Sequence, residues 1–271
     1  MQFNFRLQKT IEERDSLVCV GLDVNLQKFP IHLKDAEDAV LQFNQAIIKA
    51  TSDLVVAYKP NLAFYEALGT QGWSMLHQTL EMIPKGIIKI GDAKRGDIGT
   101  TAQMYAKSLF DLGFDVVTVN PYLGLDSVAP FIEDENKGVF ILCLTSNPSS
   151  RDFQYLETSG RPLYELVAEK VVQWNKKGNC GLVVGATHPN ELERIRAIAP
   201  DLPFLIPGIG AQGGDLEASV MAGTNAAGGL SVINSSRSII YATSDTHFAD
   251  AARREADKLR QAINSVRVKK K

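Results

Sequence analysis

The chain has 271 residues, of which 45% are hydrophobic and 22% charged, and 29 Lys and Arg against 31 Asp and Glu give a formal net charge of −2. Such a composition is typical of a soluble globular protein with a sizeable core and excludes long disordered stretches. A chain without net basic charge lacks the field that attracts polyanions, so we expect no nucleic-acid partner.

The cysteines and the apolar runs bear on where in the cell the protein is expected to be found. Three cysteines, an odd number, stand in apolar runs and are expected to be buried thiols rather than disulfide partners or metal ligands; they are Cys19, Cys143 and Cys180. The N-terminus has no signal-peptide pattern, and the apolar runs are far shorter than the roughly 20 residues of a membrane helix. We therefore expect a cytoplasmic protein that does not bind membranes.

In chain order, a helical segment from Asn4 to Asp15 precedes short apolar, β-branched runs that alternate with segments of helical spacing. The last helical segment runs from Ala249 to Val266. The apolar runs predict eight strands, over Leu17 to Leu22, Leu54 to Tyr58, Gly86 to Ile90, Asp115 to Val119, Gly138 to Leu144, Gly181 to Gly185, Pro203 to Ile206 and Gly228 to Ile233.

Runs that are apolar on both faces indicate strands buried on both sides, as in parallel sheets. Eight strand-helix units in a chain near 250 residues suit an α/β fold of the (β/α)8 TIM barrel type. We predict one such domain over residues 1–271, with the N-terminal helix capping its bottom. An open doubly wound sheet is the alternative, but no Gly-x-Gly-x-x-Gly follows the first strand.

The predicted strands end in polar and charged residues whose side chains can bind a ligand or take part in catalysis. In a TIM barrel the active site lies at the carboxyl ends of the strands, so these residues are expected to meet there. They are Asp23, Lys59, Asn61, Asp92, Lys94, Asp97, Ser146, His188 and Arg237, together with the glycine-rich turn from Gly208 to Gly214. The long connection from Thr145 to Pro162 is expected to be a functional loop, whereas His188, which precedes a proline, is interpreted as structural.

The polar residues that end the third predicted strand include the most informative pair. Asp92 and Lys94 are two residues apart and should point to the same face, into the mouth of the barrel. A structural ion pair with Lys59 is one interpretation, although buried pairs add little stability over a hydrophobic replacement. A catalytic array of charges is the hypothesis that the pattern favours.

Two further segments predict contacts to a ligand. The run Thr100 to Gln103 reads as a capping box, which leaves Thr101 open between helix start and ligand contact. The glycine-rich turn carries Gln212, and Arg237 follows two small serines after the last strand. The loops after the last two strands of a barrel often bind phosphate, and we predict a phosphate site there.

The segment Asp92-Ala-Lys-Arg-Gly-Asp97, followed by Ile98-Gly-Thr-Thr101, resembles the Asp-x-Lys-x-x-Asp signature of orotidine 5'-monophosphate decarboxylases. Lys59, in Ala57-Tyr-Lys-Pro-Asn61, follows the preceding predicted strand and is part of the same resemblance. The resemblance extends over essentially the whole chain. The segments 207–214 and 235–237 resemble the longer bacterial, type 2 branch of that family.

The resemblance implies decarboxylation of orotidine monophosphate to uridine monophosphate and CO2, the last step of de novo pyrimidine synthesis, with no cofactor and no metal. An alternating array would surround the scissile carboxylate, with Lys94 as proton donor to C6, and its members are Lys59, Asp92, Lys94 and Asp97. The family is dimeric, and Asp97 of one subunit would serve the site of its neighbour, together with Ile98 and Thr101.

The resemblance also implies substrate-binding roles. Asp23 and Lys59 would hold ribose hydroxyls, and Ser146 would contact the pyrimidine. Gln212 and Arg237 would bind the phosphate, although the shorter branch places its phosphate arginine differently.

Three other functions remain open at this stage. A phosphosugar synthase or decarboxylase of the same barrel superfamily would require a divalent metal. A Schiff-base enzyme would use Lys59 or Lys94 as a nucleophile. A catalytically inactive barrel would bind a nucleotide and regulate a partner.

Overall fold

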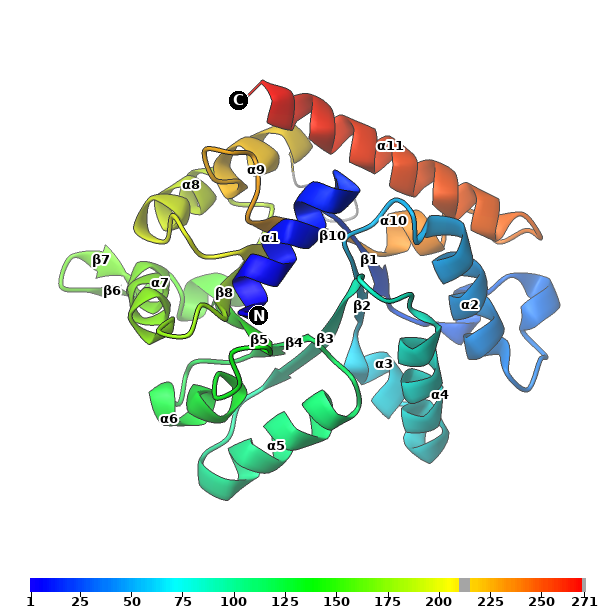
Figure 1. The fold of residues 1–271 in the computed structure, drawn as a ribbon, viewed down its shortest axis with the longest axis horizontal. Coiled ribbons are helices and arrows are strands. Elements are labelled where there is room, and N and C mark those ends of the chain that lie inside the picture. The colour runs from blue at the N-terminus through cyan, green and yellow to red at the C-terminus, as the bar shows by residue number, and fades with distance from the viewer. Residues whose placement is uncertain (210–214, 270–271) are drawn as a thin grey trace.

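The computed structural model describes residues 1–209 and 215–269. Within these residues, eight parallel strands close into a barrel in the order β1-β10-β9-β8-β5-β4-β3-β2, and helices surround it (Figure 1). The barrel strands are β1 (Val18–Leu22), β2 (Ala57–Pro60), β3 (Ile88–Arg95), β4 (Val116–Val119), β5 (Gly138–Leu144), β8 (Cys180–Val184), β9 (Phe204–Pro207) and β10 (Ser231–Ser235). The predicted (β/α)8 TIM barrel is confirmed.

The longer helices alternate with the strands along the chain, the first preceding β1 and the last following β10. They are α1 (Phe3–Arg14), α2 (Ala39–Thr51), α4 (Gly69–Met82), α5 (Gly99–Asp111), α7 (Leu163–Trp174), α8 (Pro189–Ile198), α9 (Leu216–Gly223) and α11 (Phe248–Val268). Short helical turns are α3 (Leu62–Glu66), α6 (Leu125–Val128), α10 (Arg237–Ile240), η1 (Leu26–Lys28), η2 (Ile31–Leu33), η3 (Ala129–Phe131) and η4 (Pro148–Asp152). None of the helices in the described part of the chain is long and apolar enough to cross a membrane.

Burial of the strands on both faces builds the core. Every residue of β1, β4 and β8 is buried, as expected for strands that face side chains inside the barrel and helices outside it. The three cysteines are buried free thiols, as predicted.

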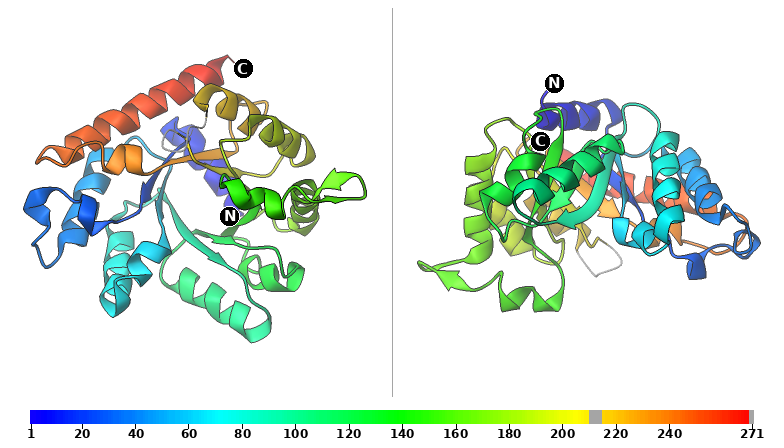
Figure 2. Two further views of the ribbon diagram at one scale, coloured as in Figure 1. Left: turned by 180° about the vertical axis from the view of Figure 1, so that it is seen from behind. Right: turned by 90° about the horizontal axis from the view of Figure 1, so that it is seen from below.

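Helix α1 lies across one end of the barrel, whereas the connections that follow the strands lie at the other end (Figure 2). The ring of Phe3 rests on the start of β5, where a Cβ on Gly138 would come within 2.3 Å of it. Close approach of the helix therefore requires glycine at position 138.

The predicted long connection between β5 and α7 contains η4 and a small antiparallel hairpin of β6 (Glu157–Thr158) and β7 (Arg161–Pro162). The hairpin projects from the barrel (Figures 1 and 2). Gln154 fastens the base of the loop, because its side chain accepts a hydrogen bond from the Thr145 amide and donates one to the Thr145 hydroxyl, each at 2.8 Å.

Candidate active site

A cavity of about 700 Å³ opens at the carboxyl ends of the barrel strands. Its apolar floor includes Leu142, Val183 and Leu205. Its polar lining comprises Asp23, Lys59, Asn61, Asp92, Lys94, Thr118, Thr145, Ser146, Asn147, Asn234, Ser236 and Arg237. A cavity with a partly apolar wall and converging polar groups has the size and character of a small-molecule site.

Asp92 stands between two lysines on neighbouring strands. Its Oδ2 accepts a hydrogen bond from Lys59 Nζ at 2.8 Å, and its Oδ1 accepts one from Lys94 Nζ at 2.5 Å. The Lys59 side chain is 4% exposed and that of Lys94 is 48% exposed. Lys59 is therefore fixed in the floor, whereas the Lys94 ammonium faces the open part of the cavity.

The surroundings keep Asp92 and Lys59 charged. Burial alone would raise the pKa of Asp92, but the charges and hydrogen bonds of Lys59 and Lys94 outweigh it and hold that pKa well below its usual range. Burial alone would lower the pKa of Lys59, but Asp92 and Asp23 hold it above its usual range. Two positive charges and one negative charge make the array attractive to an anionic ligand.

Asp23 lies on the opposite side of the cavity from the long loop. Its backbone carbonyl accepts a hydrogen bond from the Tyr241 hydroxyl at 2.9 Å, which fixes the turn after β1. Asp23 Oδ1 and Asn234 Oδ1 are both buried and have no hydrogen-bond partner in the part of the chain that the structure describes. Buried acceptors without a donor are costly, so these two oxygens are natural partners for hydroxyl groups of a ligand.

Two other predicted ligand-binding residues, Ser146 and Arg237, line the cavity. Ser146 reaches the cavity because the neighbouring Gly185 has no side chain; a Cβ there would lie 3.0 Å from the serine Cβ. Arg237 is the exposed first residue of α10 and lines the cavity. Gln212 lies outside the described residues. His188 does not line the cavity and contacts Tyr155, with 3.4 Å between Nδ1 and the tyrosine hydroxyl.

Asp97, Ile98 and Thr101 do not line this cavity. The Asp97 carboxylate accepts a hydrogen bond from the Ile98 amide at 2.8 Å, and Ile98 is 56% exposed. The predicted capping box is wrong. Helix α5 begins at Gly99 after Ile98, and no side chain caps it, so Thr100 already lies in the first turn and cannot be the N-cap.

Thr118, Asn147 and Asn234 line the cavity but were not predicted as site residues. Thr118 lies within the apolar run Val116–Val119, where a threonine is an ordinary β-former and gives no separate signal. Asn234 could have been found, because an asparagine at the end of a buried strand is unusual. In the described ranges 1–209 and 215–269, no cluster of three His, Cys, Asp or Glu side chains could share a metal ion.

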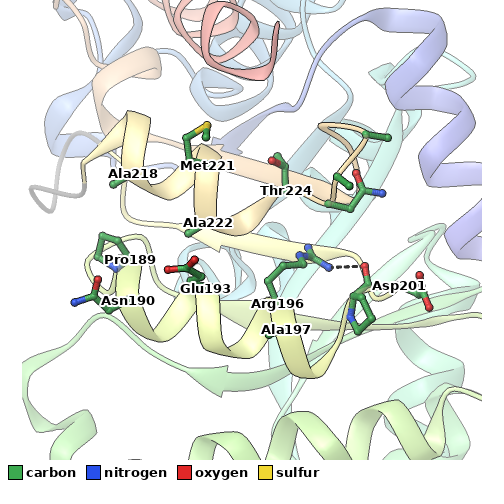
Figure 3. A pocket seen from close by; sticks show the side chains of 14 residues that line it. Pro189, Asn190, Glu193, Arg196, Ala197, Asp201, Ala218, Met221, Ala222 and Thr224 are labelled. Carbon is green, nitrogen blue, oxygen red and sulfur yellow. Dashed lines mark hydrogen bonds between the residues drawn. The ribbon is translucent and has the colours of Figure 1, made fainter. Parts of the chain in front are cut away.

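A second hollow, of about 870 Å³, lies outside the barrel between α8 and α9 (Figure 3). Its buried charged side chain is Arg196, which reaches from α8 toward the turn before Asp201 (Figure 3). The guanidinium donates to five backbone carbonyls, those of Ala199, Pro200, Leu202, Gly223 and Leu230. Arg196 thus holds elements together and has no donor directed at a ligand, so the larger hollow is not the candidate site.

The barrel, with a charged array at the carboxyl ends of its strands, defines an enzyme of the TIM-barrel class. Residues 16–252 match the model of the Orotidine 5'-phosphate decarboxylase / HUMPS family. A protein of Dehalococcoides mccartyi named orotidine 5'-phosphate decarboxylase is 52% identical over 98% of this chain and 99% of its own length. One of Herpetosiphon aurantiacus with the same name is 52% identical over 92% of this chain and 94% of its own length.

Solved structures agree with these relatives. The OMP decarboxylase of Leishmania donovani has a TM-score of 0.86 and is 42% identical, with 99% of this chain and all of that one covered. The UMP synthase of the same organism has a TM-score of 0.89 at 43% identity over 98% of this chain, which spans 57% of that longer protein. The chain belongs to the orotidine 5'-phosphate decarboxylase / HUMPS family, as the signature around Asp92 predicted.

Proposed function

We propose that this protein converts orotidine 5'-monophosphate to uridine 5'-monophosphate and CO2, the last step of de novo pyrimidine nucleotide synthesis, without a cofactor or metal. The observation that carries the proposal is the Lys59-Asp92-Lys94 array at the barrel mouth. It occurs in a chain about half identical, over nearly its full length, to proteins named for this activity.

The reaction requires a cation beside C6 of the pyrimidine. When the bond from C6 to the carboxylate breaks, CO2 leaves and the electron pair stays at C6 in the plane of the ring, where the π system cannot delocalise it. An ammonium next to C6 stabilises that pair and then transfers a proton to it. Lys94 fits this role because its ammonium is half exposed to the cavity and is held in place by Asp92.

Asp92 acts mainly by positioning the lysines. Two unit charges about 4 Å apart at an effective dielectric near 20 repel by only about 4 kcal/mol. Enzymes on difficult reactions require on the order of 20 kcal/mol of barrier reduction. Repulsion between Asp92 and the substrate carboxylate therefore supplies a minor part, and the charge of Lys94 supplies more.

Other predicted site residues bind the ribose, the pyrimidine and the phosphate of the nucleotide. Asp23 and Lys59 hold ribose hydroxyls, in keeping with the unpartnered Asp23 Oδ1. Ser146 contacts the pyrimidine from the long loop. Arg237, together with Gln212, binds the phosphate. Binding of the remote phosphate provides free energy that organises the charged site around C6.

A homodimer completes the site. Asp97, Ile98 and Thr101 project from the start of α5 outside their own cavity, where they can reach the cavity of a second copy. Exposed apolar side chains around them support a packing surface there, namely Ile98, Met104, Tyr105, Tyr122, Leu123 and Leu125. Asp97 then acts across the interface.

The first experiment follows the absorbance change when chelator-treated protein is mixed with orotidine monophosphate, alongside Lys94→Ala. Turnover without metal that disappears in the variant supports the reaction and the proton donor. Turnover only with magnesium and a sugar phosphate would assign the chain to the metal-dependent branch instead. Trapping by borohydride would indicate a Schiff base, and tight uridine monophosphate binding without turnover would indicate an inactive regulator.

A complementation experiment tests the shared site. Asp97→Ala and Lys94→Ala proteins, each inactive, are mixed under conditions that exchange subunits. If Asp97 serves the partner's site, half of the dimers are hybrids with one intact site, and about a quarter of the wild-type activity returns. No recovery, although light scattering shows a dimer, would place Asp97 in its own subunit's site.

A further inference from the structure

We propose that Thr118 is a positioning residue that fixes both the backbone of Lys94 and the carboxylate of Asp92 for proton transfer. The inference rests on the decarboxylation proposed above. Thr118 lies on β4, is 1% exposed, and lines the cavity without being a member of the charged array.

The pairing of β3 with β4 places Thr118 opposite a bulge. Gly91 pairs with Val117, and Arg95 pairs with Val119, so three residues of β3 lie opposite the single residue Thr118. Those three residues are Asp92, Ala93 and Lys94. The strand therefore bends where the two charged side chains leave it, as bulges beside active sites commonly do.

The Thr118 hydroxyl makes every hydrogen bond that a hydroxyl can make. Its Oγ1 accepts from the amides of Ala93 at 3.0 Å and Lys94 at 2.9 Å, and it donates to Asp92 Oδ1 at 3.1 Å. A hydroxyl has one donor and two acceptor lone pairs. All three are directed at the bulge, and among side chains of this size only threonine and serine offer that combination.

The bulge needs such a support because Lys94 has a φ of 46°. Residues other than glycine rarely adopt the left-handed region, and surrounding structure must hold them there. The bond from the Lys94 amide to Thr118 does so. The same hydroxyl donates a hydrogen bond to Asp92 Oδ1, the oxygen that also accepts one from the Lys94 ammonium. Thr118 therefore holds both the backbone of Lys94 and its counter-ion.

Replacement by valine keeps the shape of Thr118 and removes all three hydrogen bonds, whereas serine keeps them. A displacement of about 1 Å at a reacting group can lower a rate about 100-fold. Thr118→Val should therefore lower kcat by about that factor. KM should change by less than about threefold, because the ribose and phosphate contacts lie elsewhere. Thr118→Ser should retain kcat within about threefold.

Thr79→Val is the matched control. Thr79 is a fully buried threonine on α4 whose hydroxyl accepts a hydrogen bond from Asn44 Nδ2 at 3.0 Å, away from the cavity. Its loss should lower the melting temperature and leave kcat unchanged. If Thr118→Val kept kcat within about threefold, or Thr118→Ser and Thr79→Val lost as much as Thr118→Val, the proposal would be overturned.

Hydrogen exchange separates this proposal from the proposed function. In Thr118→Val the amides of Ala93 and Lys94 should exchange faster than in the wild type, and in Thr118→Ser and Thr79→Val they should not. Unchanged exchange in Thr118→Val would refute the anchor. If the wild type fails to decarboxylate orotidine monophosphate, the proposed function is wrong, and the exchange result still decides whether Thr118 holds the bulge.

Discussion

The two ion pairs of Asp92, with Lys59 and with Lys94, should contribute unequally to stability. At an effective dielectric near 20, unit charges at the 2.8 Å separation of Lys59 and Asp92 attract by about 6 kcal/mol. Much of that offsets the desolvation of both groups, but removing one partner of a buried pair still costs roughly 3 to 5 kcal/mol. Lys94 is 48% exposed, and such pairs contribute at most about 1 kcal/mol.

Asp92→Asn should therefore lower the free energy of unfolding by about 3 kcal/mol, or roughly 6 to 12 °C in melting temperature. Lys94→Ala should change it by less than about 1 kcal/mol and still lower kcat more than about 100-fold. Urea unfolding followed by circular dichroism measures the first quantity, and the orotidine monophosphate assay measures the second. Equal destabilisation by the two variants would refute the conclusion that the buried pair with Lys59 contributes more to stability than the exposed pair with Lys94.

Three further predictions concern other parts of the molecule. Because the folded-state pKa of Asp92 is lowered, its contribution to stability should be complete above an unfolded-state pKa of about 3.9 and lost as the pH falls below that value. Urea titrations of wild type and Asp92→Asn should therefore differ by a constant amount from pH 5 to 8 and converge in acid. Burial raises the pKa of all three thiols, that of Cys19 to about 12, so Ellman's reagent should label the thiols of the unfolded protein only; labelling of the native protein would contradict the buried placement. Arg196→Met should lower the free energy of unfolding by more than about 2 kcal/mol, because buried carbonyls lose their donor, without altering kcat; a change in kcat would show that the groove between α8 and α9 communicates with the barrel mouth.

The barrel could be predicted because its strands carry a strong signal. Segments such as Gly138–Leu144 are apolar on both faces, which is typical of a strand in a sheet covered on both sides, and six of these seven residues are buried. Strand boundaries are harder to predict where polar residues continue a strand. The second strand was predicted to end at Tyr58 but includes Lys59 and Pro60, and the third was predicted to end at Ile90 but extends to Arg95. The charged residues of the site interrupt the apolar pattern, so the pattern ends before the strands do.

The location of the candidate site followed from a rule of topology rather than from contacts. Asp23, Lys59 and Ser146 are far apart in sequence, and the prediction that they meet rests on the shared direction of the strands. The contacts that fix them could not be predicted in this way. The bond from Tyr241 to the Asp23 carbonyl joins residues 218 positions apart, and no periodic pattern records such a pairing. The roles of these residues in binding remain predictions.

The bulge in β3 shows where a correct prediction rested on incomplete reasoning. Strand alternation predicts that Asp92 and Lys94 share a face, and both side chains do line the cavity. Regular alternation does not produce this arrangement, because the pairing shifts between Gly91 and Arg95 and Lys94 has a positive φ. This bulge is hydrogen-bonded to Thr118 on the neighbouring strand β4, and the sequence pattern of β3 alone does not record that contact.

The cavity at the barrel mouth and the hollow between α8 and α9 differ in how their polar groups are satisfied, and that difference outweighs size in locating function. In the groove between α8 and α9, Arg196 is bound by backbone carbonyls and holds the fold together. At the barrel mouth a lysine is buried, another has a left-handed backbone, and two buried acceptors, on Asp23 and Asn234, have no donor in the described part of the chain. Each of these features lowers stability on its own. Their concentration around one cavity is explained if a ligand's hydroxyl groups and anionic charge complete the contacts that the protein leaves open.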